Sequence, residues 1–91
     1  VVNYGHIGDG NVHTAPIIDP ENPEEVERAL KLVDDIHLLA IELNGSTTGE
    51  HGVGAVRREY ARLEHGDAVD MMQAVKNALD PHKIMNPGKV F

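Results

Sequence analysis

Residues 5–13 are Gly-His-Ile-Gly-Asp-Gly-Asn-Val-His, and this stretch decides how the fold begins. The dipeptide Asp9-Gly10 lies between residues of β character, which is a strong signal for a tight hairpin turn. We therefore predict two short antiparallel strands within residues 1–18. A turn centred on this dipeptide pairs residues whose numbers sum to nineteen, so that His6 faces His13.

This pairing places two imidazoles on one face of the hairpin. Directly opposed side chains have Cβ atoms about 4.5–5.5 Å apart, so both rings reach a single metal ion at about 2.0–2.1 Å per bond. We expect the other face, with Ile7, Val12 and Ile18, to pack on the helices and hold the pair rigidly. The alternative is that His6 and His13 are two unrelated polar residues on a solvated sheet face.

The first predicted helix runs from Pro23 to about Leu43. Asn22 is suited to cap its start, and Pro23 to stand in its first turn. Apolar residues follow the 3.6-residue period of an amphipathic helix, and Asn44-Gly45 provides the stop. The apolar positions are Val26, Ala29, Leu30, Val33, Ile36, Ala40 and Leu43.

The second main helix is predicted between Asp67, as its cap, and Asp80-Pro81, which ends it. Its expected buried face consists of Ala68, Met71, Met72, Val75 and Leu79. A glycine-rich link at 46–55, with room for a short strand, and a charged helical stretch at about 56–64 separate the two main helices. The fold class predicted from these elements is α+β, a β-hairpin plus two main helices.

Composition limits the classes of function. A chain of 91 residues allows one small domain, and eight basic against fifteen acidic residues give a net charge of −7, which repels nucleic acid. Cysteine is absent, so any metal must be held by His and carboxylate. We expect no membrane span, since no apolar stretch approaches about 20 residues. Val1 stands where a strand is already under way, which suggests a fragment of a longer chain.

A third candidate ligand is Glu50, in the sequence Gly49-Glu50-His51-Gly52. Two histidines and one carboxylate with a coordination position left open are a recurring catalytic metal set. In an extended loop Glu50 and His51 point in different directions, so that one binds metal while the other faces substrate. The alternative is that this pair is merely solvated.

Three arginines follow the glycine-rich link, namely Arg57, Arg58 and Arg62. A guanidinium binds a substrate carboxylate well. Surface pairing with Glu59 or other nearby carboxylates is the competing role, which we expect for most of them. His37 lies near the apolar stripe of the first helix, where a hydrogen-bonded boundary residue is expected rather than a ligand.

Three segments taken together resemble one family: GHIGDGNVH at 5–13, TTGEHGVG at 47–54 and DPHKIMNPGKVF at 80–91. They resemble the C-terminal part of the FAD-linked oxidases of the vanillyl-alcohol-oxidase type. This group includes D-lactate dehydrogenase, the glycolate oxidase flavin subunit and D-2-hydroxyglutarate dehydrogenase. The resemblance implies that residues 1–91 form the C-terminal part of a ferredoxin-like substrate, or cap, domain, with the FAD-binding domain absent.

The resemblance also implies a reaction, the FAD-dependent oxidation of a small 2-hydroxy acid to a 2-oxo acid. His6, His13 and Glu50 would bind a divalent metal, zinc or manganese, that coordinates the substrate, and His51 would be the catalytic base. Asn86 and Lys89 resemble the terminal turn that approaches the flavin. FAD itself would be bound mainly by the missing FAD-binding domain, so the fragment alone should not turn over.

Two further expectations follow from the resemblance. Hydroxyglutarate-type relatives tend to have a polar residue where this chain has Ala15, which favours a lactate- or glycolate-like substrate. We expect a cytoplasmic protein, or one peripheral to the membrane through its electron-accepting partner.

Two alternatives to the flavoenzyme remain open. The first is a non-catalytic metal-binding or assembly module that uses the same histidine pair structurally, which a fourth protein ligand would favour. The second is a homo-oligomer that forms through surfaces left bare by the missing domain.

Overall fold

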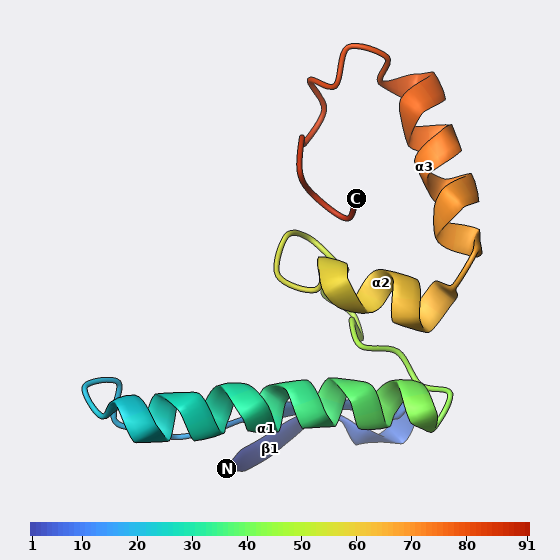
Figure 1. Cartoon of the computed structure of the whole chain (residues 1–91). Coiled ribbons are helices and arrows are strands. Elements are labelled where there is room, and N and C mark those ends of the chain that lie inside the picture. Colours follow the sequence, from blue (N-terminus) through green and yellow to red (C-terminus); the bar gives the residue numbers. More distant parts are fainter.

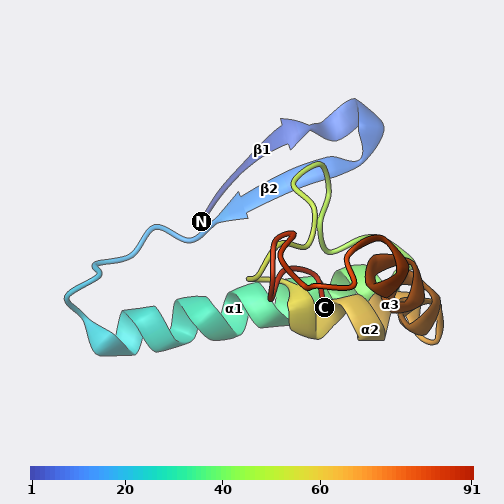
Figure 2. The same cartoon turned by 90° about the horizontal axis from the view of Figure 1, so that it is seen from above.

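The computed structural model describes all 91 residues and has an α+β architecture, which confirms the predicted class (Figure 1). A two-stranded antiparallel hairpin lies along one side of a long helix, and two shorter helices follow before a tail that curls back toward the second helix (Figure 2). The elements are β1 (Val2–His6), a short 3-10 helix (Ile7–Asp9), β2 (Asn11–Ala15), α1 (Pro23–Glu42), α2 (Arg58–His65) and α3 (Ala68–Leu79).

The hairpin forms where predicted, but the predicted pairing of His6 with His13 is wrong. Tyr4 lies opposite His13, and His6 lies opposite Asn11. The turn is longer than expected, because residues 7–10 form a 3-10 turn that the Gly10 N–H closes by donating to the Ile7 carbonyl at 3.0 Å. The register is therefore shifted by two residues. Since side chains alternate with a period of two, His6 and His13 still share one face.

The apolar face of the hairpin does not pack on the helices, so the expectation that Ile7, Val12 and Ile18 would do so is wrong. Val12 is 52% exposed and Ile7 lies exposed in the turn, while Ile18 falls beyond β2 and is also exposed. The side chain of His13 is only 22% exposed. It is thus the histidine-bearing face that turns inward, toward α1 and the loop that follows α1.

Helix α1 begins and ends close to the predicted positions. The side chain of Asn22 accepts hydrogen bonds from the backbone N–H groups of Glu24 and Glu25, which satisfies two of the free donors at the start of a helix. Asn44 has a positive φ of 59° and ends the helix in a left-handed conformation. The glycine-rich loop at 45–55 follows directly after this end of α1.

Helix α2 joins α1 through an aromatic and polar contact. The Tyr60 hydroxyl donates to Asp34 Oδ1 at 2.7 Å, and its ring stacks on His37 with centroids 4.7 Å apart. The hydrogen bond to Asp34, together with burial, raises the pKa of Tyr60 to about 12. His37 bonds through Nδ1 to the Val33 carbonyl and is half-buried, so its predicted boundary role is confirmed.

Helix α3 forms where predicted, but Asp67 precedes it without a side-chain capping hydrogen bond, so the predicted cap is wrong. The expected buried face of α3 is exposed. Met71 and Leu79 are 70% and 73% exposed, and only Val69 is buried. Leu30 and Leu43 of the predicted apolar stripe on α1 are exposed as well. Helix α2 makes the main contacts with both α1 and α3, and an open cleft lies between β2 and the second half of α1, so much of the apolar surface of the helices is exposed.

The buried residues are few, and two of them are polar. Tyr60, Ala61 and Val69 form the apolar centre, whereas Thr47 and Asp80 are buried anchors. Asp80 bonds to Lys76 and accepts from the backbone N–H groups that follow it in the tail, at 84 and 85. The bond from Lys76 outweighs burial and, with the two backbone bonds, keeps the pKa of Asp80 below its ordinary value.

No helix combines the length and apolar character that a membrane crossing needs.

Candidate metal centre

The loop between α1 and α2 is anchored to α2 by a buried carboxylate. Glu64 accepts hydrogen bonds from the Thr47 backbone N–H at 2.9 Å and from the Thr47 hydroxyl at 2.8 Å. Burial acts to raise the pKa of Glu64, but the bonds from Thr47 and Ser46 outweigh it and hold that pKa below its ordinary value. The short strand predicted in this loop does not form, and the loop keeps its shape through this anchor.

We expect Glu64→Gln to lower the free energy of unfolding by about 1–2 kcal/mol at neutral pH, because the charged acceptor for Thr47 is lost. Since the folded pKa of Glu64 is depressed, its contribution is fully present above its unfolded value near 4.5 and is lost as the pH falls through the lower folded value. Denaturation of the wild type and of Glu64→Gln across this pH range should therefore show a difference in the free energy of unfolding that disappears in acid. Glu59→Gln, at an exposed carboxylate on the same helix, is the control. A difference between wild type and Glu64→Gln that is equal at every pH contradicts the stabilising role of the Glu64 carboxylate.

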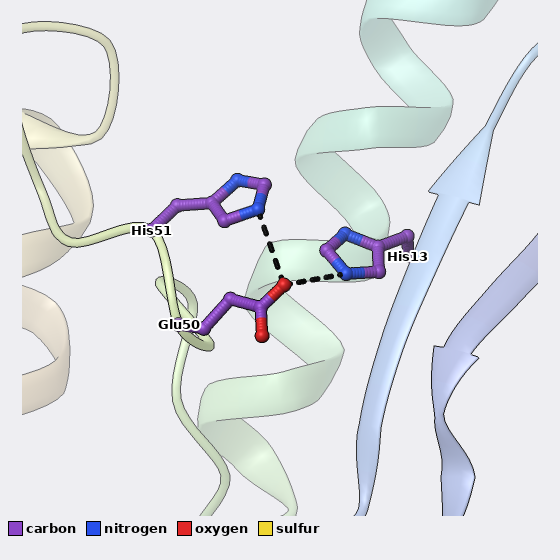
Figure 3. A group of neighbouring side chains, drawn as sticks. All are labelled: His13, Glu50 and His51. Atoms are coloured by element: carbon purple, nitrogen blue, oxygen red, sulfur yellow. Dashed lines mark hydrogen bonds and ion pairs between the residues drawn. The ribbon is translucent and has the colours of Figure 1, made fainter.

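Glu50 is the centre of a cluster of four side chains. Its Oε1 lies 3.2 Å from His13 Nε2 and 3.5 Å from His51 Nε2, and its Oε2 lies 3.6 Å from His6 Nε2. Figure 3 shows the rings of His13 and His51 on either side of the Glu50 carboxylate. Potential ligand atoms of His13, Glu50 and His51 all lie within 4.8 Å of one another. The structure thus brings together all four residues that the sequence singled out for metal binding and base catalysis.

Glu50 and His51 converge, so the expectation that they diverge is wrong. The expectation assumed an extended loop, but the His51 N–H donates to the Thr48 carbonyl at 3.0 Å, which closes a turn. Gly49 and Gly52 on either side have positive φ values of 54° and 75°, a conformation that glycine adopts at little cost. Neighbours in sequence can therefore aim at one point.

The cluster fits a divalent cation. Two ligand atoms that each lie about 2.1 Å from a tetrahedral ion are about 3.4 Å apart. The separations of 3.2 and 3.5 Å between Glu50 Oε1 and the Nε2 atoms of His13 and His51 fall around this value, and these are the three side chains whose potential ligand atoms all lie within 4.8 Å of one another. His6 Nε2 lies 3.6 Å from the other Glu50 oxygen and is outside that group of three. Imidazole and carboxylate are also ligand types that zinc and manganese accept. His6, with its side chain 65% exposed, lies at the open side of the cluster.

Tyr4 and Gly5 position His13, and the sequence analysis did not identify either of them. The Tyr4 ring stacks on the His13 ring with centroids 5.1 Å apart. Gly5 has a φ of 133°, and a Cβ there would lie 2.6 Å from the Asn11 carbonyl oxygen and 2.9 Å from His13 Cδ2. A glycine inside a predicted strand is a signal for such close approach, and it was available in the sequence.

The two predicted flavin-contacting residues lie elsewhere. Asn86 and Lys89 are exposed and line a separate hollow of about 290 Å³ between α3 and the tail. The Val90 N–H donates to the Gly54 carbonyl at 2.7 Å, which ties the tail to the glycine-rich loop. The tail is therefore held against the loop segment that follows the metal cluster, and contact with a flavin stays a prediction.

Comparison with known proteins agrees with these motifs. Residues 1–90 match the family model "FAD linked oxidases, C-terminal domain". The chain is 42% identical over 92 residues to glycolate oxidase subunit GlcD of Bacillus subtilis, with 100% of the chain and 20% of that protein covered. It is 49% identical over 88 residues to D-lactate dehydrogenase (cytochrome) 1, mitochondrial, of Saccharomyces cerevisiae, with 96% and 15% covered.

A probable mitochondrial D-lactate dehydrogenase of Danio rerio is 41% identical over 88 residues, which cover 96% of the chain and 18% of that protein. The chain thus spans a fifth or less of the length of these relatives. Since the family model covers all but the last residue, the chain belongs to the family of the FAD linked oxidases, whose C-terminal domain it matches.

Proposed function

We propose that this chain carries the metal and substrate site of an FAD-dependent enzyme that oxidises a 2-hydroxy acid of the D-lactate or glycolate type to a 2-oxo acid. The names of the relatives, a glycolate oxidase subunit and D-lactate dehydrogenases, support the substrate class. The observation that carries the proposal is the convergence of three imidazoles on Glu50. FAD is bound mainly by a domain outside these 91 residues and supplies the acceptor for the C2 hydride.

In this proposal His6, His13 and Glu50 would hold the divalent ion, zinc or manganese. When bound, the ion supplies Lewis-acid chemistry that makes the substrate 2-hydroxyl more acidic. His13 is the best-supported of the ligands, because Tyr4 stacks on its ring and its side chain is the least exposed of the cluster. Glu50 would balance part of the charge of the ion, and its carboxylate lies within 3.2–3.6 Å of the three imidazoles.

His51 takes the proton of the substrate 2-hydroxyl at Nε2 and so acts as general base. Its side chain is half-exposed, and Nε2 lies 3.5 Å from Glu50 Oε1. The ring therefore stands beside the ligand set while it remains accessible from the cleft in front of it. The turn that the His51 N–H closes with Thr48 fixes the backbone from which the ring projects.

Removal of the metal tests the proposed function. We expect the complete flavoenzyme to oxidise D-lactate or glycolate, to contain zinc or manganese, and to lose activity by roughly 100-fold or more after chelation, because the metal is worth several kcal/mol of transition-state stabilisation. Activity should return when either ion is added back. An enzyme with full activity and no bound metal contradicts the metal role, and an enzyme inactive on both acids contradicts the substrate class.

A further inference from the structure

Tyr4 is the residue directly opposite His13 in the hairpin, and its ring stacks on the His13 ring. The two ring planes are 18° apart and their centroids are 5.1 Å apart, which is within the range of an offset stack. Directly opposed side chains on one face of a sheet make the closest cross-strand contacts. The observed register thus gives His13 an aromatic neighbour, where the predicted register would have placed His6.

The position of Tyr4 indicates a role at the metal cluster rather than in the packed core. Tyr4 is 57% exposed, whereas Tyr60 is buried. The Tyr4 side chain lines the open cleft of about 850 Å³ in front of the metal cluster, together with His13 and Glu50. A residue this exposed contributes little to the core, so its effect is to be sought at the ring that it contacts.

The His13 ring is restricted by neighbours on several sides. Tyr4 stacks on it, and the His51 ring lies 5.0 Å away with its plane tilted by 37°. Gly5 leaves room for it, because a Cβ there would lie 2.9 Å from His13 Cδ2. These contacts keep His13 Nε2 directed at Glu50 Oε1, 3.2 Å away. Among these neighbours, Tyr4 has a side chain that can be removed without touching a proposed ligand or the proposed base.

We infer that Tyr4 is a positioning residue that strengthens metal binding through the His13 ring. The inference rests on the proposed function, in which His13 is a metal ligand. A coordinated divalent ion draws electron density from an imidazole and leaves its ring partly positive, and the electron-rich face of an aromatic ring attracts positive charge. The stack is therefore stronger when the metal is bound than when it is absent, and this difference adds to the affinity for the metal.

The test measures the metal affinity of the complete flavoenzyme, for zinc and for manganese, by competition with a chelator of known affinity. We expect Tyr4→Val to weaken the binding of the ion that the wild type holds by about 10-fold, the lower end of the range for loss of a group that supports a ligand. Valine is a good strand former, so β1 keeps its propensity. Tyr4→Phe keeps the stacked ring and should keep the wild-type affinity.

Activity provides a second measurement. Tyr4→Val should lose activity when the metal is limiting and regain most of it when the metal is in excess, because the proposed ligands and base remain. Damage to the hairpin itself would leave the variant inactive at every metal concentration, and that result contradicts a role through metal affinity. Val2→Ala is the matched control, because Val2 lies on the same face of β1 but opposite Ala15, and it should leave the affinity unchanged.

A wild-type metal affinity in Tyr4→Val, or an equal loss in Val2→Ala, overturns the inference while the proposed function stands. A wild-type enzyme that binds neither zinc nor manganese overturns both. The two failures are distinguishable, because the first leaves a metal-containing wild-type enzyme and the second does not.

Discussion

Replacing His13 by alanine is expected to abolish metal uptake and to lower kcat/KM for the 2-hydroxy acid by more than 100-fold. The His13 ring is fixed between Tyr4 and His51, and its Nε2 approaches Glu50 Oε1 at 3.2 Å, the shortest separation in the cluster. Loss of a group that only supports a ligand costs about 10–100-fold in metal affinity or activity, so loss of a ligand itself should cost more.

The measurements for this variant are elemental analysis of the purified flavoenzyme and steady-state kinetics. His6→Ala should have the same effect, although the His6 side chain is more exposed and its Nε2 lies 3.6 Å from Glu50 Oε2. His82→Ala is the control, because that residue lies exposed in the tail, away from the cluster. Retention of metal and activity by both His6→Ala and His13→Ala refutes the site.

The hairpin shows what local sequence can and cannot predict. The Asp-Gly dipeptide predicts a turn and therefore two strands, and both are present. The length of the turn depends on whether Ile7 and Gly8 continue the strand or enter the 3-10 turn, and residue types do not decide this. The error of two residues left His6 and His13 on one face because side chains alternate with a period of two. The prediction of a shared face was thus insensitive to the mistake in register.

For the helices, too, local sequence predicts some features and contacts with the rest of the chain decide others. Capping by Asn22 is a local property, and the start of α1 is where the sequence places it. Which apolar residues are buried depends on what packs against each helix. Met71 and Leu79 have the right spacing for a buried face, yet no other part of the chain reaches that face. Periodicity predicts that a helix forms and which side is apolar, but not that the side is covered.

The candidate metal centre depends both on local sequence and on contacts between residues distant in the sequence. The residue types in Gly49-Glu50-His51-Gly52 make this segment a candidate metal-binding loop, but the direction of the side chains depends on a turn to Thr48 and on the bond between Thr47 and Glu64. The second contact joins residues seventeen positions apart. The predicted surface pairing of the arginines holds for Arg62, which pairs with Asp70, whereas Arg57 bonds through Nη1 to the Gly52 carbonyl.

His51→Ala is expected to leave the metal bound and to reduce turnover by about 10²- to 10⁴-fold, the range for a lost general base. All three imidazoles lie at similar distances from Glu50, so His51 could be a ligand by geometry alone. The two roles give different results. If His51 is the base, metal content stays at the wild-type level while kcat falls, and the limb of the pH–rate profile that reports the base disappears.

If His51 is a ligand in place of His6, His51→Ala loses metal together with activity, and His6→Ala keeps both. The pair of variants therefore separates the set His6, His13 and Glu50 from the set His13, Glu50 and His51, whose ligand atoms cluster within 4.8 Å. His51→Gln is a useful companion, because an amide keeps hydrogen bonding beside Glu50 but cannot accept a proton at neutral pH. In the proposed site His6 and His13 are metal ligands, so His51 is the one imidazole that can act as base. Unchanged turnover in both His51 variants therefore removes His51 from catalysis.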